Sequence, residues 1–199
     1  VLTRSLIEEQ DRRTLGDALV NVSGVVPTRS EELLFIPPLV RGFPAEVYLD
    51  GLPIYAGNQQ AFDPTSLVGV ERVEVLKGPS ATLYGGGLGT PLGGIINIES
   101  ERPNARLGGF VGMRAGSFST RNPYANINVP LAKGVAARIA AEYQENNSWI
   151  DQVHGRRSSV QPSLAFQIDP RTDLLFQGQF NRRSQLEYSG LPATQALNG

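Results

Sequence analysis

The stretch "RVEVLKGPSATLYGGGLGTPLGGIINIESERP", residues 72–103, decides how this chain is interpreted. It begins with a strand pattern in which Arg72 and Glu74 alternate with Val73 and Val75, and this pattern ends at a Gly-Pro turn. A glycine-rich run follows and leads into a second strand pattern, "GGIINIES". Three interpretations compete: a phosphate-binding loop, a plain strand–turn–strand connection, and a segment that binds a ligand or moves.

The glycine run does not fit a nucleotide site. The segment "GPSATLYGGG" lacks the Gly-Lys-Ser/Thr that holds phosphates and magnesium in a P-loop. The segment "GGGLGTPLGG" does not open a long helix, because Pro91 interrupts it. Nucleotide binding is therefore rejected, and a flexible connection between two strands stays open as the plain alternative.

Composition excludes several other classes. The formal net charge of -1 gives no bulk basic field that would draw the chain to nucleic acid. The absence of cysteine removes disulfides and thiolate chemistry, and the single histidine, His154, rules out a multi-histidine metal site within this chain. No arrangement of side chains suggests a nucleophile or a paired-carboxylate site. We therefore expect no catalytic residues and no protein metal ligand.

The first hundred residues mix helix and strand signals. The segment "RTLGDALVNVSGV" predicts a short helix with Thr14 as its N-cap and Gly24 as its stop. The segment "VYLDGLPIY" predicts two short strands joined by an Asp50-Gly51 turn. Residues 1–103 are therefore expected to form a small α/β domain.

From about Leu107 the pattern alternates with period two. In "VAARIAAEYQ" the side chains of Ile139 and Tyr143 face one way, and those of Arg138 and Glu142 face the other. Short connections alternate with a longer polar one, "ENNSWIDQVHGRR", as in an outer-membrane barrel. A soluble β-sandwich gives the same alternation and stays open on this half alone. About five strands cannot close a barrel, so on the barrel interpretation we expect further strands after residue 199.

Four segments in order resemble the plug domain of TonB-dependent outer-membrane receptors: "IEEQDRRTLGDALVNVSGV", "LVRGFPAEVYLDGLPI", "LVGVERVEVLKGPSATLYGGG" and "GGIINIESERP". The alternating strands then fall where the barrel of that family begins. The resemblance implies an α/β plug domain, a small mixed sheet with short helices, in residues 1–103. It implies that residues 104–199 are antiparallel N-terminal strands of a transmembrane β-barrel, an incomplete fragment of a 22-stranded barrel.

The resemblance also implies a function. A receptor of this family lies in the bacterial outer membrane, binds a ferric siderophore and imports it with energy from TonB and its inner-membrane complex. Its partners are the siderophore, TonB and outer-membrane lipid, with no nucleic acid, and it has no cofactor because the iron arrives already chelated. Receptors for cobalamin, haem or oligosaccharides are alternatives within the family. A soluble all-β binding module, or a receptor-like signalling protein, is the alternative outside transport.

Residues that match the apex of the family's plug are expected to contact the ligand. They are Arg41, Tyr55, Gly57, Asn58, Gln59, Leu83 and Tyr84. Arg41 is equally suited to a structural hydrogen bond inside the plug, and the two tyrosines to ordinary packing. Arg72 and Lys77 are expected to pair with carboxylates on the inner barrel wall, with a solvated strand face as the alternative. Leu92, Glu99 and Glu101 depart from the family's siderophore members.

Overall fold

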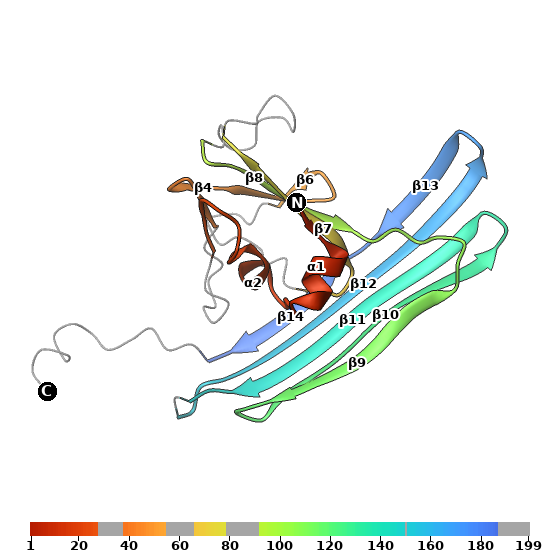
Figure 1. The fold of residues 1–199 in the computed structure, drawn as a ribbon. Helices are drawn as coiled ribbons and strands as arrows, with labels where there is room; N and C mark the ends of the chain where they lie inside the picture. Colours follow the sequence, from red (N-terminus) through yellow and green to blue (C-terminus); the bar gives the residue numbers. More distant parts are fainter. Residues whose placement is uncertain (28–37, 55–65, 79–91, 150, 187–199) are drawn as a thin grey trace, which may run out of the picture.

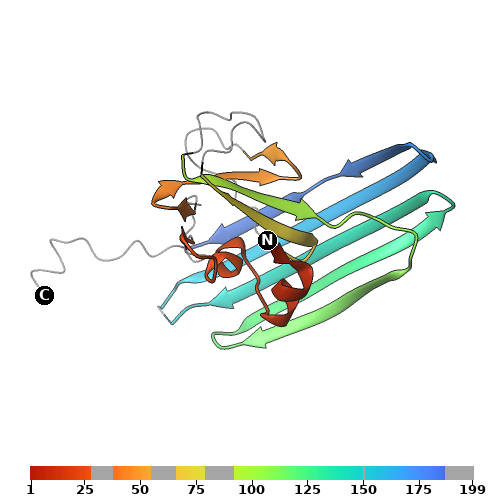
Figure 2. The same ribbon diagram turned by 45° about the horizontal axis from the view of Figure 1, so that its top comes forward.

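A computed structural model describes residues 1–27, 38–54, 66–78, 92–149 and 151–186. A small mixed domain made by the first hundred residues lies on one face of a long, curved sheet made by the rest (Figure 1). Figure 2 shows helices α1 and α2 together with β7 and β8 over that face. This face of the long sheet is called the inner face below, and the opposite one the outer face.

The first domain contains two short helices, α1 (Arg4–Glu9) and α2 (Leu15–Leu19). Thr14 caps α2 as predicted: its side chain accepts a hydrogen bond from the Asp17 backbone amide, and the Asp17 carboxylate accepts one from the Thr14 amide. The helix is shorter than the pattern predicts, because it ends at Leu19 well before Gly24. Within the described part of the chain, neither helix is long or apolar enough to cross a membrane.

The sheet of this domain has the order β1-β7-β8-β5-β6, and a smaller one has the order β2-β3-β4. The first sheet is mixed, since β5 and β8 are parallel and the other pairs are antiparallel. Its strands are β1 (Leu2–Thr3), β5 (Glu46–Leu49), β6 (Leu52–Pro53), β7 (Val70–Lys77) and β8 (Gly94–Ser100). The smaller sheet has β2 (Val25–Val26), β3 (Leu39–Val40) and β4 (Phe43–Pro44).

The turn between β5 and β6 is the predicted one. Asp50 and Gly51 have φ values of 51° and 79°, as in a type I′ hairpin turn. The Asp50 carboxylate accepts hydrogen bonds from the amide and hydroxyl of Ser100, at 2.7 and 2.8 Å. The hairpin tip is thereby held against the end of β8.

The core of the first domain corrects the strict alternation expected along β7. A register shift between Val70 and Arg72 lets both Val70 and Val73 turn into the core, although alternation puts them on opposite faces. A sequence pattern cannot show such a bulge, because the bulge depends on how β7 pairs with β8. The buried core comprises Ile7, Leu15, Ala18, Leu19, Val25, Val40, Ala45, Val47, Leu67, Val70, Val73, Ile96 and Ile98.

The long sheet is an antiparallel meander whose strands are tilted across the view in Figure 1. Its strands are β9 (Gly108–Gly116), β10 (Thr120–Ala132), β11 (Val135–Asn147), β12 (His154–Asp169), β13 (Thr172–Gln177) and β14 (Phe180–Gln185). The boundary predicted after residue 103 falls between β8 and β9. The sheet does not close on itself within these residues.

The two faces of the meander match the predicted alternation. On β11, Ile139 and Tyr143 are exposed on the outer face, whereas Ala140 and Glu142 are buried on the inner face. On β10, three asparagines on the inner face are buried: Asn122, Asn126 and Asn128. The outer face is therefore apolar and the inner face is polar, which fits a membrane strand better than a sandwich strand.

Strands β13 and β14 are one strand that is interrupted in its hydrogen bonding. Ser163 of β12 lies opposite Gln177, and Val160 lies opposite Phe180, so the register continues through the interruption. Between these two pairs, Pro162 of β12 has no amide hydrogen to donate, although its carbonyl still accepts a hydrogen bond from the Gly178 amide at 3.0 Å. The strand therefore runs on along β12 past the missing bond.

Candidate functional site

Among the described residues, ion pairs and buried polar side chains gather at the contact between the first domain and the inner face. Three segments of the first domain make it: the N-terminal helix with the loop behind it, the turn of residues 66–70, and the linker of residues 101–106. Each meets polar side chains of β9–β12.

Arg4 ties the N-terminal helix to the turn of residues 66–70. Its Nη1 donates hydrogen bonds to the carbonyls of Leu67 and Val68, at 2.7 and 3.0 Å, and its Nε pairs with Glu8 at 2.7 Å. The guanidinium also lies 5.0 Å from the centre of the Phe110 ring, on the inner face of β9. One side chain thus connects helix, turn and strand.

Asp11, behind the helix, is bonded to the long sheet. Its carboxylate accepts a hydrogen bond from Arg114 Nε of β9 at 2.6 Å, and another from Arg13 at 3.0 Å. Arg114 also donates to Asn122 and lies 3.9 Å from the centre of the Tyr124 ring. Burial acts to raise the pKa of Asp11, but the hydrogen bonds from the two arginines outweigh it, so the pKa is lowered.

Glu101, at the start of the linker, is the centre of a group of polar contacts with β10 and β11. Its carboxylate accepts hydrogen bonds from Arg138 of β11, at 2.5 Å, and from the Asn126 amide of β10. The Asn126 amide also donates to the Val68 carbonyl at 2.9 Å, and Arg4 Nε lies 4.0 Å from Glu101. The Glu101 and Arg138 side chains are only 18% and 13% exposed, so this is a largely desolvated ion pair.

The turn of residues 66–70 is pressed against the strands at Gly69. A Cβ added to Gly69 would overlap Gln161 Oε1 and lie 2.8 Å from the Ala140 Cβ. Gln161 donates from its amide to the Ser66 carbonyl at 3.1 Å, beside this point. A side chain at position 69 would therefore push the turn away from β11 and β12.

Beyond Glu101, the linker is held by an amide side chain. Asn128 of β10 accepts from the Asn104 amide at 3.0 Å and donates to the carbonyls of Asn104 and Arg106, at 2.8 and 2.5 Å. Its side chain is almost fully buried. Asn128 thus fixes the chain where it passes from the first domain into β9.

Another ion pair joins two neighbouring strands on the inner face. Glu142 of β11 and Arg157 of β12 approach to 3.0 Å, and the Glu142 side chain is 2% exposed. Removing either partner would leave a buried charge without compensation, which is costly. The inner face therefore carries a paired charge as well as the residues that meet the first domain.

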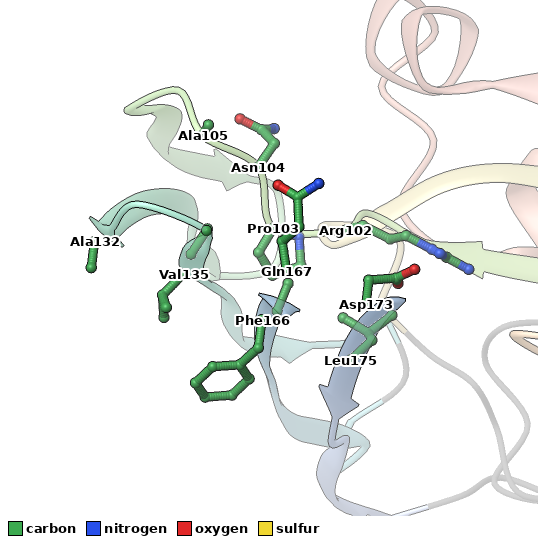
Figure 3. Close-up of a pocket in the computed structure, with 13 residues that line it drawn as sticks. Arg102, Pro103, Asn104, Ala105, Ala132, Val135, Phe166, Gln167, Asp173 and Leu175 are labelled. Carbon is green, nitrogen blue, oxygen red and sulfur yellow. The ribbon is translucent and has the colours of Figure 1, made fainter. Parts of the chain in front are cut away.

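Of the cavities that described residues line along this contact, two are much larger than a third, which has a volume of about 20 Å³. The larger, of about 360 Å³, lies between the linker and the ends of β10–β13, and Figure 3 shows the Phe166 ring pointing away from Asn104 and Gln167. The smaller, of about 190 Å³, is lined by Glu101 and Arg138 together with Gln161, Gln177 and Gln179. The contact is thus polar and incompletely packed, unlike a protein core.

The predicted site residues are only partly described. Tyr55, Gly57, Asn58, Gln59, Leu83 and Tyr84 lie outside the described residues. Arg41 is exposed in the turn between β3 and β4, with φ 54°, and its backbone amide donates to the Gly24 carbonyl at 2.8 Å. Its guanidinium is directed toward Gly78, with Nη1 3.8 Å from where a Cβ on Gly78 would stand. Arg41 thus lies beside the end of β7.

The two predicted wall contacts lie on β7. Arg72 pairs with Glu99 of β8 at 2.7 Å and with Glu74 at 2.8 Å, both within the first domain, and the Glu74 hydrogen bond raises the pKa of Arg72. Lys77 is exposed at the end of the strand. Their contact with a barrel wall stays a prediction.

Sequence reasoning missed the side chains that make the contact. Arg138 was correctly predicted to lie on the polar face of its strand, but its partner and those of Arg114 and Asn126 depend on how two distant parts of the chain dock. Glu101 was noted as a departure from the family, and the structure gives it a partner, Arg138. A carboxylate just after one strand pattern and arginines on a polar strand face were the available signals.

No group of three or more His, Cys, Asp or Glu residues suited to a metal ion occurs among the described residues. The titratable groups that are gathered at the contact are instead paired with one another.

Comparisons with known proteins agree with this architecture. The TonB-dependent Receptor Plug Domain family matches residues 1–90. The ferrioxamine B receptor of Salmonella typhimurium strain SL1344 is 30% identical over 206 residues, which cover 96% of this chain and 28% of that protein. The metal-pseudopaline receptor CntO of Pseudomonas aeruginosa PAO1 is 33% identical over 119 residues, or 59% of this chain and 16% of that protein.

Solved structures give the same result. The ferric-catecholate import receptor Fiu of Escherichia coli K12, in its open form, superposes with a TM-score of 0.81 at 26% identity, covering 96% of this chain and 27% of that one. The pyoverdine receptor FpvA of Pseudomonas aeruginosa PAO1, bound to pyoverdine, gives 0.76 at 25% identity, covering 90% and 26%. The chain spans less than a third of the length of the curated relatives it matches.

Proposed function

Because this chain belongs to the TonB-dependent receptors of the bacterial outer membrane, as their plug domain and first barrel strands, we propose that the whole protein binds and imports a ferric siderophore. The observation that carries the proposal is the similarity to a ferrioxamine B receptor along nearly the whole chain, plug and strands together. Proteins of this family are transporters, not enzymes. The iron would enter as a chelate, so the protein itself needs no cofactor.

The contact between plug and strands supports a transport role. A plug that blocks a barrel must be held firmly at rest and released during each import cycle. Ion pairs such as Asp11–Arg114 and Glu101–Arg138 hold it with groups that water can replace on release. A contact made of apolar side chains would instead expose apolar surface to water whenever the plug moved.

A ligand panel tests the proposal. The full-length receptor is refolded in detergent and titrated with ferrioxamine B, a ferric catecholate, ferripyoverdine, cobalamin, haem and an oligosaccharide, while Tyr and Trp fluorescence is followed. We expect saturable quenching by one of the ferric siderophores. Saturable binding of cobalamin, haem or a glycan alone would overturn the siderophore proposal in favour of that alternative.

Energy from TonB is a separate part of the proposal. Cells that carry the receptor are given the bound siderophore with radioactive iron, with and without a functional TonB. Import is expected to stop without TonB, while binding at the cell surface persists. Equal import in both strains would refute TonB dependence and leave ligand binding untouched.

The similarity to the metal-pseudopaline receptor, whose name leaves the metal open, favours a second candidate, a metal chelate in which the metal need not be iron. The same titration with one chelator loaded with Fe³⁺, Zn²⁺ or Ni²⁺ separates the two. A siderophore receptor prefers the ferric complex by at least tenfold. Preference for a divalent complex would identify the second candidate.

We also propose that the plug apex contacts the chelate through Arg41, Tyr55, Gly57, Asn58, Gln59, Leu83 and Tyr84. Arg41 is a suitable cation for a negatively charged chelate because it is an exposed residue. Arg41→Ala and Tyr84→Ala are expected to weaken binding about tenfold each, whereas Tyr143→Phe, on the outer face, leaves it unchanged. Unchanged affinity in both alanine variants would remove these residues from the site.

A further inference from the structure

The outer face of the long sheet changes character along its length. Toward the turn at residues 133–134 it carries exposed apolar side chains, among them Val129, Leu131 and Phe176. Toward the loop at residues 148–153 it carries charged ones instead. Those on the outer face there are Arg121 of β10, Glu145 of β11, Arg156 of β12 and Arg182 of β14.

The strand register places these charges side by side. Arg121 lies opposite Glu145, and Glu145 lies opposite Arg156, to which it is bonded at 2.8 Å. Arg156 lies opposite Ser184, two residues from Arg182. Since neighbouring strands are about 4.8 Å apart, three arginines form a short band across the sheet. This set, Arg121, Arg156 and Arg182, is called the arginine band.

The arginine band has an excess of positive charge. Only Arg156 of the three has a carboxylate partner among the residues that the structure describes. Its own side chain is 63% exposed, so even this arginine has donors turned to the surroundings. A planar guanidinium bonds phosphate through two parallel donors, which makes arginine well suited to anionic head groups.

The depth of the band follows from its neighbours. Tyr143, the next outer-face residue of β11, is 40% exposed, and its hydroxyl lies 3.5 Å from the Glu145 carboxylate. Tyrosines with one polar end mark the boundary between hydrocarbon and head groups in membrane barrels. The arginine band lies just beyond that boundary, at the depth of lipid head groups.

The short connections fix which side of the membrane this is. At one end of the strands both connections, residues 133–134 and 170–171, are tight turns, whereas the other end has one short turn, residues 117–119, and the longer connection between β11 and β12. Outer-membrane barrels place the end with only short turns on the periplasmic side. The arginine band lies at the opposite ends of the strands, at the left in Figure 1, and so in the outer leaflet.

We propose that the arginine band binds the phosphates of an anionic lipid of the outer leaflet. The site is on the outside of the barrel, so it goes beyond the proposed import function and does not depend on which chelate is carried. The lipid would brace the extracellular ends of β10–β14 from outside while the plug contacts them from inside.

The test uses the full-length receptor in detergent and two lipids, lipid A with its two phosphates and the same lipid after phosphatase treatment. Native mass spectrometry measures the bound fraction against lipid concentration. The variant Arg121→Gln with Arg182→Gln keeps the Arg156–Glu145 pair intact and is expected to weaken lipid A binding about 25-fold, at about fivefold for each arginine. The matched control, Lys133→Gln with Arg171→Gln, removes two cations at the other rim and should change binding less than twofold.

A second variant works in the opposite direction. Glu145→Gln removes the carboxylate that pairs with Arg156 and is expected to tighten lipid A binding severalfold, so the proposal stays testable if the double variant does not fold. Equal binding by parent and double variant, equal binding of the phosphate-free lipid, or weaker binding in Glu145→Gln each overturns it. Displacement of lipid A by millimolar inorganic phosphate would show a site for free anions and refute the lipid assignment.

Discussion

Inside the plug, Leu19, Val73 and Ile96 are fully buried among apolar side chains, whereas the plug meets the strands through Glu101, Arg138 and other polar groups. The two regions also differ in packing, since cavities of about 360 and 190 Å³ lie along the contact. The apolar interior stabilises the fold of the plug, and the polar contact holds the folded plug against the strands. Separating the plug from the strands is therefore expected to cost less free energy than unfolding the plug.

The largest expected effect comes from the plug interior. Ile96→Ala removes a fully buried side chain of β8 and should destabilise the plug by about 2–5 kcal/mol, whereas Ile96→Val should cost about 0.5–1.5 kcal/mol. Urea unfolding of the full-length receptor, followed by hydrogen exchange in residues 94–100, measures this. A plug as tolerant of Ile96→Ala as of Ile96→Val would break the comparison, because its interior would not be the stabilising region.

The next effect concerns the contact with the strands. Arg138→Met leaves Glu101 without its closest cation and should weaken docking by about 1.5–3 kcal/mol, with faster hydrogen exchange in residues 66–78. The plug interior, read from residues 94–98, should stay protected. Arg156→Met is the matched control, since its ion pair with Glu145 is exposed and should contribute less than about 1 kcal/mol. Equal loss of protection in both segments would mean that docking and folding are one event.

Sequence patterns predict the local features of the plug and the strands well. The Thr14 cap, the Asp50-Gly51 turn and the two faces of β11 follow from local rules, and the structure confirms them. The exception within the plug is Val70, which a bulge turns into the core. Local propensity and alternation depend on residues that are close in the sequence. They therefore predict caps, turns and strand faces, but not how strands pair.

The contact itself could not be predicted, because it pairs residues far apart in the chain. Asn126 bonds the Val68 carbonyl, and Arg114 bonds Asp11 from more than a hundred residues away. Alternation along a strand predicts which side chains share a face, but it does not predict which residues of the plug that face contacts. The same limit applies to Arg72, whose partners depend on the register of β7 and β8.

A smaller effect is expected from Gly69→Ala. The added Cβ meets Gln161 Oε1, which can swing aside, and the Ala140 Cβ, which cannot without a shift of the turn. We expect docking to weaken by about 1 kcal/mol, the low end of the range for overpacking. Gly24→Ala, at a positive φ with open space around it, is the control for backbone strain alone. If Gly69→Ala left exchange in residues 66–70 unchanged, the close approach at Gly69 would not contribute to docking.

The smallest effect is a pH dependence at Asp11. Its pKa is lowered in the folded protein, so the Asp11–Arg114 contact stabilises docking above the ordinary aspartate pKa of 3.8 and is lost as the pH falls through the lower folded value. Since the Asp11 side chain is half exposed, the contribution should stay below about 1 kcal/mol. Asp11→Asn should therefore lower the denaturation midpoint of the plug at pH 6 and match the parent near pH 2. Glu9→Gln, a neighbouring exposed carboxylate, should have no such effect; a midpoint difference for Asp11→Asn that persists at pH 2 would show that the position acts through packing instead of charge.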